Sequence, residues 1–292
     1  MRVFVTGGTG FTGSRLVPLL LQEGYPVRCL YRPTSDRSTL LSAHPDIEWV
    51  EGDLSRTQPL ASAMHGSDVL VNIASLGSGH ADSILHAAQS VGITRAIFIS
   101  TTAIFTRLDA KSRKIRVAAE LSIEMSGLQY TILRPTMIYG SPRDRNMWRL
   151  IRFLRYSPVI PVFGDGLSLQ QPIYVDDVAR AVVSCLSSAK TVCKSYNIAG
   201  KHPLTYNEVI DTIARQLKKK VWKWHIPSMP VIALLALFER LRIPLPIKAE
   251  QVQRLNENKN FSTSEAERDF GFRPLSFEEG VGLEIAAYNR TR

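Results

Sequence analysis

A glycine-rich segment near the start of the chain has the residue types and spacing that hold a diphosphate. It reads Thr6-Gly7-Gly8-Thr9-Gly10-Phe11-Thr12-Gly13 and separates a short apolar run from a stretch with helical spacing of apolar residues. We expect Gly7 to adopt the positive φ of a tight turn, Gly10 to admit the diphosphate, and Gly13 to let the helix pack closely against the sheet. Free amides and the dipole at a helix N-terminus favour such an anion. The segment therefore predicts a dinucleotide site.

Basic residues lie where the second strand is expected to end, and they bear on the choice of dinucleotide. Arg32 follows the run Val27–Tyr31, and Arg28 and Arg37 lie nearby. NAD sites often place an acidic residue here to bind the ribose 2′-hydroxyl, whereas a guanidinium can bind a 2′-phosphate. We therefore predict a preference for NADP(H), with NAD(H) as the alternative. In the simpler interpretation, Arg32 is a solvated loop cation.

Asp53 and Leu54 follow the third expected strand. Asp53 is placed to contact the adenine edge, with Leu54 beside the adenine face. Alternatively, Asp53 only forms the turn after Gly52.

Strand and helix patterns alternate through the first half of the chain. Strands are expected at residues 2–6, 27–31, 47–50, 69–73, 96–100 and 130–133, and helices at 11–23, 60–64, 81–91 and 112–125. This alternation implies a parallel sheet covered on both faces. We expect an α/β fold with a Rossmann-type doubly wound parallel sheet. Residues 1–160 would form the dinucleotide-binding core and 161–292 mainly a smaller C-terminal substrate lobe, with some segments returning to the core.

These motifs resemble the extended and atypical short-chain dehydrogenase/reductase superfamily, and within it the NAD-dependent epimerase/dehydratase family. The resemblance covers nearly the whole chain, with landmarks TGGTGFTG at 6–13, GDL at 52–54, ISTTAIF at 99–105, AAE at 118–120, YTILRPTMIYG at 130–140, PIYVDDVARAV at 172–182, YNIAG at 196–200 and FGFRP at 270–274. It implies an NAD(P)-dependent oxidoreductase or an epimerase/dehydratase-like enzyme. Many members act on nucleotide sugars and others reduce ketones or steroids, so a nucleotide sugar is the leading expectation for the small-molecule substrate.

The resemblance also implies roles for individual residues. Ala74, after the fourth strand, would approach the nicotinamide ribose. Thr101 or Thr102 would occupy the position of the family's catalytic Ser/Thr, which hydrogen-bonds the reacting carbonyl. Residues 135–139 would border the nicotinamide and substrate, and Asp53 and Leu54 would hold the adenine. The diphosphate would be lined by Gly7, Gly10, Phe11, Thr12 and Gly13.

The helix after the fifth strand departs from the family's Tyr-x-x-x-Lys pattern. In that pattern the cation holds the ribose and lowers the pKa of the tyrosine, so that the phenol exchanges a proton with the substrate. Alignment on AAE puts Ser112 in the tyrosine position and Arg116 in the lysine position, and no tyrosine occurs between Tyr31 and Tyr130. Arg116 can still bind the ribose, but Ser112 is a poor acid at neutral pH.

Three interpretations of this departure stay open. In the first, a substitute acid acts, and the candidates are Tyr139, Thr102 and His80; of these, His80 is the one whose unperturbed pKa lies near neutrality, although a histidine at a helix start is more often a cap neighbour. In the second, water or the substrate supplies the proton. In the third, the chain is an NADP(H)-binding regulatory or assembly protein without catalytic activity.

The formal net charge of +10 favours anionic partners. Basic side chains between residues 143 and 155 could bind a diphosphate or an acidic membrane, although a solvated face is at least as well supported. No Lys/Arg run is interleaved with aromatic residues, so we expect no nucleic-acid partner. The three cysteines lack CxxC spacing, so we expect no metal site. The basic cluster comprises Arg143, Arg145, Arg149, Arg152 and Arg155.

The stretch 221–247 is unusually apolar for a substrate lobe, with Trp222, Trp224 and the run VIALLALF. It could line a pocket for a lipid-like substrate, contact a membrane surface or form an interface such as that of a homodimer, but core packing is the default expectation. The run is far shorter than the roughly 20 residues that span a bilayer. Since only Met1 and Arg2 precede the first strand, which leaves no room for a signal peptide, we expect a cytoplasmic protein.

Overall fold

Apolar strands buried on both faces form a seven-stranded sheet in the computed structural model, which describes residues 1–108, 111–144, 146–241, 243 and 248–290. The strand order is β11-β6-β5-β4-β1-β2-β3, and every neighbouring pair is parallel. The predicted Rossmann-type fold is confirmed. The strands are β1 (Val3–Thr6), β2 (Val27–Tyr31), β3 (Glu48–Glu51), β4 (Val69–Asn72), β5 (Arg95–Ile99), β6 (Gln129–Pro135) and β11 (Lys194–Ile198).

Helices cover both faces of this sheet, as the near-continuous apolar strands require. One buried cluster joins the sheet to α1 (Gly13–Gln22), α2 (Ser38–Ala43), α7 (Val175–Ser187) and α11 (Ser264–Phe270). A second cluster joins the opposite face to α3 (Thr57–Met64), α4 (Ala81–Ser90) and α5 (Lys111–Glu124). Short 3₁₀ turns follow β4, β5 and α7, namely η1 (Leu76–Ser78), η2 (Thr102–Phe105) and η3 (Ala189–Thr191).

The lobe has a separate core around Tyr139, formed by α6 (Met147–Tyr156), α8 (Tyr206–Gln216) and α12 (Phe277–Arg290). Two short strand pairs connect it to the sheet: β7 (Ile138–Tyr139) with β10 (Ile173–Tyr174), and β9 (Leu169–Gln170) with β12 (Leu204–Thr205). The division at residue 160 stays a prediction, and α7, β11 and α11 from the second half do pack on the sheet.

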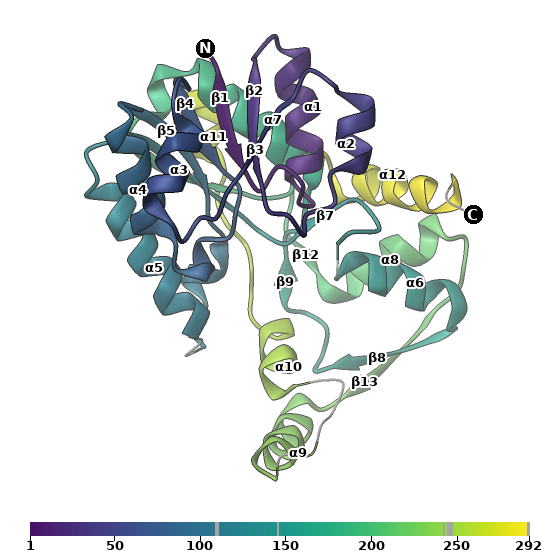
Figure 1. Cartoon of the computed structure of the whole chain (residues 1–292). Helices are drawn as coiled ribbons and strands as arrows, with labels where there is room; N and C mark the ends of the chain where they lie inside the picture. The colour runs from purple at the N-terminus through teal and green to yellow at the C-terminus, as the bar shows by residue number, and fades with distance from the viewer. Residues whose placement is uncertain (109–110, 145, 242, 244–247, 291–292) are drawn as a thin grey trace.

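A two-stranded ribbon extends from the lobe. It pairs β8 (Val159–Phe163) with β13 (Trp222–Ile226) and leads to α9 (Ser228–Arg240) and α10 (Ala249–Leu255). Figure 1 shows α9 at the end of the molecule opposite the sheet. None of the residues of α9 is buried, so the expectation of core packing is wrong: the helix lies beyond the lobe core and contacts mainly α10. No helix within the described ranges has both the length and the apolar character needed to cross a bilayer.

Candidate dinucleotide and active site

The loop after β1 presents backbone amides at the start of α1. Gly7 has φ +73°, and the N–H of Gly10 donates to the Gly7 carbonyl at 3.0 Å, which closes a tight turn. The N–H groups of Phe11, Thr12 and Gly13 have no acceptor within the described part of the chain. Such orphan donors at a helix N-terminus bind anions. The loop therefore fits the diphosphate of a dinucleotide.

Close packing explains why glycine occupies two of these positions. A Cβ on Gly13 would lie 2.2 Å from the Gly7 carbonyl oxygen, and a Cβ on Gly7 would lie 2.9 Å from the Ala74 nitrogen. Gly13 therefore lets the start of α1 pack directly against the phosphate loop. From the sequence we expected this glycine to let the helix pack against the sheet. A Cβ on Gly10 would lie 3.1 Å from the Gly7 carbonyl oxygen and would have no other described neighbour within 4 Å.

A buried polar contact joins the carboxyl ends of β1 and β4. Thr6 Oγ1 donates to Asn72 Oδ1 at 2.6 Å, and Asn72 Nδ2 donates to the Ala74 carbonyl at 3.0 Å. These bonds hold Ala74 beside Gly7, at the sheet edge where open α/β folds bind ligands. Sequence reasoning missed Asn72, although a polar residue ending an apolar strand is a usable signal.

The end of β2 carries cations and an aromatic platform. Arg32 is exposed, and its side chain has no partner among the described residues. The Arg37 guanidinium lies 3.9 Å from the centroid of the Tyr31 ring, which meets Trp49 edge to face. The expectation that Arg28 lies near these cations is wrong, because it points from the amino end of β2 to Glu48, 2.7 Å away.

Asp53 forms a turn at the end of β3. Its Oδ1 accepts from the backbone N–H and the hydroxyl of Ser55, both at 2.9 Å, and these bonds lower the pKa of Asp53. The adjacent Leu54 carbonyl accepts from the Ser83 hydroxyl. Asp53 therefore does form a turn after Gly52, while its adenine contact stays a prediction.

His80 lies near the end of β3, because α4, which directly follows it, is joined to that end by the bond from the Ser83 hydroxyl to the Leu54 carbonyl. It is the residue before α4 and makes no side-chain cap bond there. This places the imidazole toward the end of β3, where the adenine is expected.

The two threonines after β5 differ in their contacts. Thr101 Oγ1 accepts from the Ala103 N–H at 3.2 Å and thereby caps η2. Thr102 is buried, and its Oγ1 donates to the Pro135 carbonyl at 3.3 Å. That bond uses the Thr102 O–H, so its Oγ1 lone pairs can only accept, as from a substrate hydroxyl, whereas the Thr101 O–H stays free to donate to a carbonyl. The neighbouring Ser100 hydroxyl is buried without a partner among the described residues.

Arg116 projects from α5 toward η1. Its Nε, Cζ and Nη2 atoms lie 3.1–3.3 Å from the position of a Cβ on Gly77, just beyond Ala74. Burial, with a smaller contribution from the charge of Arg254, lowers the pKa of Arg116. No hydrogen-bond acceptor for its guanidinium occurs within the described ranges. Ser112 lies four residues earlier, on the same helix face.

Tyr139 belongs to the lobe core. It is 1% exposed, and its ring meets Tyr174 and Phe277 at centroid distances of 5.7 and 5.4 Å. Its hydroxyl fills the space beside Gly280, where a Cβ would lie 2.1 Å from it. Burial raises the pKa of Tyr139 above its ordinary value. This environment argues against Tyr139 as a proton donor.

The segment after α10, unrecognised from the sequence, closes over η2. The Glu257 carboxylate accepts from Thr106 Oγ1 at 2.8 and 2.9 Å, and Phe261 packs on Phe105. Lys259 Nζ donates to Gln170 Oε1 at 3.2 Å, and burial lowers the pKa of this lysine to about 8. No sequence signal could reveal these contacts, since they join residues between 89 and about 150 positions apart.

The basic cluster at 143–155 does not act as one surface. Arg143 Nη1 donates to the Thr9 carbonyl of the phosphate loop at 3.2 Å, whereas Arg149 and Arg152 are exposed. Arg155 donates to Asn289 Oδ1 at 2.7 Å. Arg145 lies outside the described residues.

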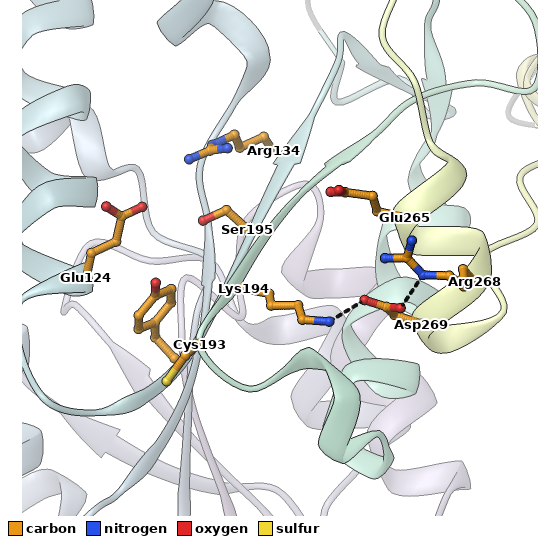
Figure 2. Close-up of a pocket in the computed structure, with 9 residues that line it drawn as sticks. Glu124, Arg134, Cys193, Lys194, Ser195, Glu265, Arg268 and Asp269 are labelled. Atoms are coloured by element: carbon orange, nitrogen blue, oxygen red, sulfur yellow. Dashed lines mark hydrogen bonds and ion pairs between the residues drawn. The ribbon is translucent and has the colours of Figure 1, made fainter.

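A polar cavity of about 500 Å³ lies at the β11 edge of the sheet, four strands away from β1. Figure 2 shows Asp269 between Lys194 and Arg268, at distances of 2.7 and 2.9 Å. Because β1 is remote, this cavity is not part of the dinucleotide site. The described residues hold no cluster of three or more His, Cys, Asp or Glu that could bind a metal ion.

Comparisons with known proteins agree with this geometry. Residues 7–189 match the family model described as NAD(P)H-binding. The chain belongs to this NAD(P)H-binding family. The dinucleotide-binding prediction is confirmed at that level.

Individual relatives differ in what they do. The chain is 25% identical to a 3 beta-hydroxysteroid dehydrogenase/Delta 5-->4-isomerase of Mycobacterium tuberculosis, over 98% of this chain and 90% of that protein. It is 25% identical to the NADH dehydrogenase [ubiquinone] 1 alpha subcomplex subunit 9 of Arabidopsis thaliana, over 89% and 69%. A UDP-glucose 4-epimerase from Thermotoga maritima, solved with UDP-glucose, shares the fold with a TM-score of 0.79 at 18% identity, over 100% and 99%.

Proposed function

We propose that this protein is an NADP(H)-dependent oxidoreductase or epimerase/dehydratase-like enzyme that interconverts a carbonyl and a hydroxyl group on a small molecule. The observation that carries the proposal is the position of Thr102 and Arg116. Both lie at the carboxyl edge of the sheet, beside the strand ends that carry the phosphate loop and Ala74. A hydroxyl and a half-buried cation at this edge suit a polar reacting group next to a nicotinamide ribose.

The proposed role of each group follows from these contacts. When bound, the nicotinamide ring supplies hydride transfer at its C4 position. The amides of residues 11–13 bind the diphosphate, Arg116 binds the ribose, and Thr102 Oγ1 orients the substrate oxygen by accepting a hydrogen bond from the hydroxyl form of the substrate. Because Ser112 replaces the family's tyrosine, we assign the proton to water. His80 and Tyr139 have less support as acids, given the position of one near the end of β3 and the burial of the other.

The cofactor preference rests on the cations at the end of β2. Arg32 is exposed and has no partner among the described residues, and Arg37 is held over Tyr31. Both can approach a 2′-phosphate, and Arg32 rather than an acidic residue directly follows β2, the position typical of the acidic residue in NAD sites. NADP(H) is therefore the proposed cofactor, with NAD(H) as the weaker ligand.

A nucleotide sugar is the first substrate class that we propose, supported by the likeness to the UDP-glucose 4-epimerase. A hydrophobic ketone or alcohol is the second, supported by the steroid dehydrogenase among the relatives and by the exposed apolar helix α9. A role without turnover, as an assembly or regulatory subunit, is supported by the missing tyrosine and the likeness to the NADH dehydrogenase subunit. A homodimer also stays a proposal.

The test combines binding and turnover. Titration calorimetry should show binding of NADPH with a dissociation constant in the micromolar range or below. A panel of nucleotide sugars, steroids and long-chain ketones should then be followed by NADPH absorbance and by product mass, because epimerases regenerate their cofactor. Tight NADPH binding without any product across the panel would favour the regulatory role, and absence of NADPH binding would refute the proposal altogether.

A further inference from the structure

The helix α9 leaves a continuous apolar face in water. Met229 is 77% exposed, Leu234 52% and Leu237 51%, although these residues lie within an uninterrupted apolar run. Leu234, Leu237 and Leu241 recur at spacings of three and four and therefore share one side of the helix. A contiguous exposed apolar surface of this kind marks a binding site.

The ribbon next to α9 continues this apolar surface with two tryptophans. Trp222 and Trp224 are 77% and 65% exposed, and they alternate with Lys223 along β13, so they point from the same face of the ribbon. Across the ribbon they pair with Val159 and Pro161, both exposed. Pro227 alone separates β13 from α9. Tryptophan is the side chain that prefers the boundary between water and hydrocarbon.

Positive charge is concentrated around the same surface. Residues 215–248 contain eight Lys and Arg residues and a single acidic residue, Glu239, within a chain whose net charge is +10. Arg215 and Lys223 pair with acidic residues outside this segment, Glu278 and Asp211, whereas Lys218 and Lys220 are exposed. Lys218, Lys219 and Lys220 directly precede β13. The surface therefore combines exposed apolar side chains with cations, which complements a negatively charged layer above a hydrocarbon interior.

We propose that α9 and the tryptophan face of β13 dock onto the surface of an anionic lipid bilayer. With 13 residues and a rise of about 1.5 Å per residue, α9 extends about 20 Å, too short for the roughly 30 Å of hydrocarbon, so it lies in the plane of the interface. A second copy of this chain fits the surface less well, because pairing like faces would bring two concentrations of positive charge together. Since α9 lies opposite the sheet, docking leaves the phosphate loop accessible (Figure 1).

The test uses the full chain and vesicles of defined composition. Flotation should recover the protein with phosphatidylcholine vesicles that contain phosphatidylglycerol, and recovery should fall at least tenfold with phosphatidylcholine alone or at high salt. The double variant Leu234→Glu/Leu237→Glu should lose binding at least tenfold. Leu121→Glu, at a 52% exposed leucine on α5, is the matched control and should bind as the unmodified chain does.

Further measurements distinguish a failure of the docking proposal from a failure of the proposed enzymatic function. NADPH affinity and circular dichroism should be unchanged in the double variant, which shows that it is folded. A second variant, Lys218→Glu/Lys220→Glu, should retain the fold and lose the preference for anionic vesicles. Failure of the unmodified chain to float, or equal flotation of the double variant, would overturn the proposal. Conversion of a dimer to a monomer by the double variant, measured by light scattering, would assign the face to a second copy instead.

Discussion

The Arg116 guanidinium lies directly over Gly77, with its Nε 3.1 Å from the position that a Cβ on Gly77 would occupy. This contact positions a half-buried cation from α5 against the turn that follows β4. A helix cation is thereby brought to the carboxyl edge of the sheet, where the ribose of the cofactor is expected.

Replacing Arg116 should weaken cofactor binding. We expect Arg116→Met to raise the dissociation constant for NADPH about tenfold, or about 1.4 kcal/mol, because a charge-assisted hydrogen bond is lost. Gly77→Ala should have a smaller effect, about two- to threefold, since the end of the arginine side chain can shift. Calorimetry checks both. The exposed Arg152→Met is the control, and an equal loss in that variant would show a general charge effect.

Gly13 should tolerate no side chain. Gly13→Ala places a methyl group 2.2 Å from the Gly7 carbonyl oxygen, so the phosphate loop has to move, and we expect at least a hundredfold loss of NADPH affinity. Gly282→Ala is the matched control, because its nearest neighbour lies at an ordinary 3.5 Å. That variant should bind normally and gain about 0.5–1 kcal/mol in stability from helix propensity. Normal binding by Gly13→Ala would contradict the assignment of this loop.

The choice between the two nicotinamide cofactors should depend on Arg32. We expect Arg32→Glu to weaken NADPH binding more than tenfold through repulsion of the 2′-phosphate, and NADH binding less than threefold. Parallel titrations of the two cofactors measure this difference. Equal loss for both would mean that Arg32 is only a solvated cation.

Thr102 and Tyr139 should differ in their effect on turnover. Thr102→Val removes the hydroxyl proposed to orient the substrate oxygen, and we expect kcat/KM to fall about a hundredfold, or about 2.7 kcal/mol. Tyr139→Phe should stay within about threefold of the unmodified enzyme, because that hydroxyl lies in the lobe core. Steady-state kinetics on the substrate identified by the panel check both. A large loss of kcat in Tyr139→Phe, with the fold intact, would restore it as the acid.

A buried carboxyl in α12 should make stability depend on pH. Burial, followed by the neighbouring Asp144 carboxyl, raises the pKa of Glu284 from 4.5 to about 10, and neither of its oxygens accepts a hydrogen bond from a described residue. Between these values the folded chain holds a proton that the unfolded chain has released. The free energy of unfolding therefore falls as pH rises through this window, by about 1.4 kcal/mol per pH unit for one group.

Glu284→Gln should remove this dependence. We expect a flatter stability profile from pH 6 to about pH 9 and a more stable variant at about pH 8, measured by urea unfolding. Glu51→Gln, at an exposed glutamate on β3, is the control and should follow the unmodified chain. Parallel profiles for the Glu284 variant and the unmodified chain would contradict the buried, protonated state of this group.

Patterns among residues close in sequence were sufficient to predict the central sheet and the phosphate loop of this protein. The run before Gly7, the glycine spacing and the alternation of apolar strands with helices follow from interactions between residues close in sequence, which predict both the sheet and the loop at the start of α1. The boundaries of β2 match the prediction, and capping boxes occur at Thr205 with Glu208 and at Ser276 with Glu279, as their spacing indicates. The same spacing at Ser262 and Glu265 forms no capping box, because Thr263 rather than Ser262 precedes α11.

Tertiary structure decided what local pattern could not. The apolar run of α9 has the composition of a core helix, and only the placement of the ribbon beyond the lobe leaves it exposed. Tyr139 follows a family motif, yet packing against Phe277 and Gly280 directs its hydroxyl away from the cofactor edge. Glu257 reaches Thr106 from about 150 residues away. Short-range spacing determines elements and loops, whereas burial and long-range contacts arise only when those elements pack together.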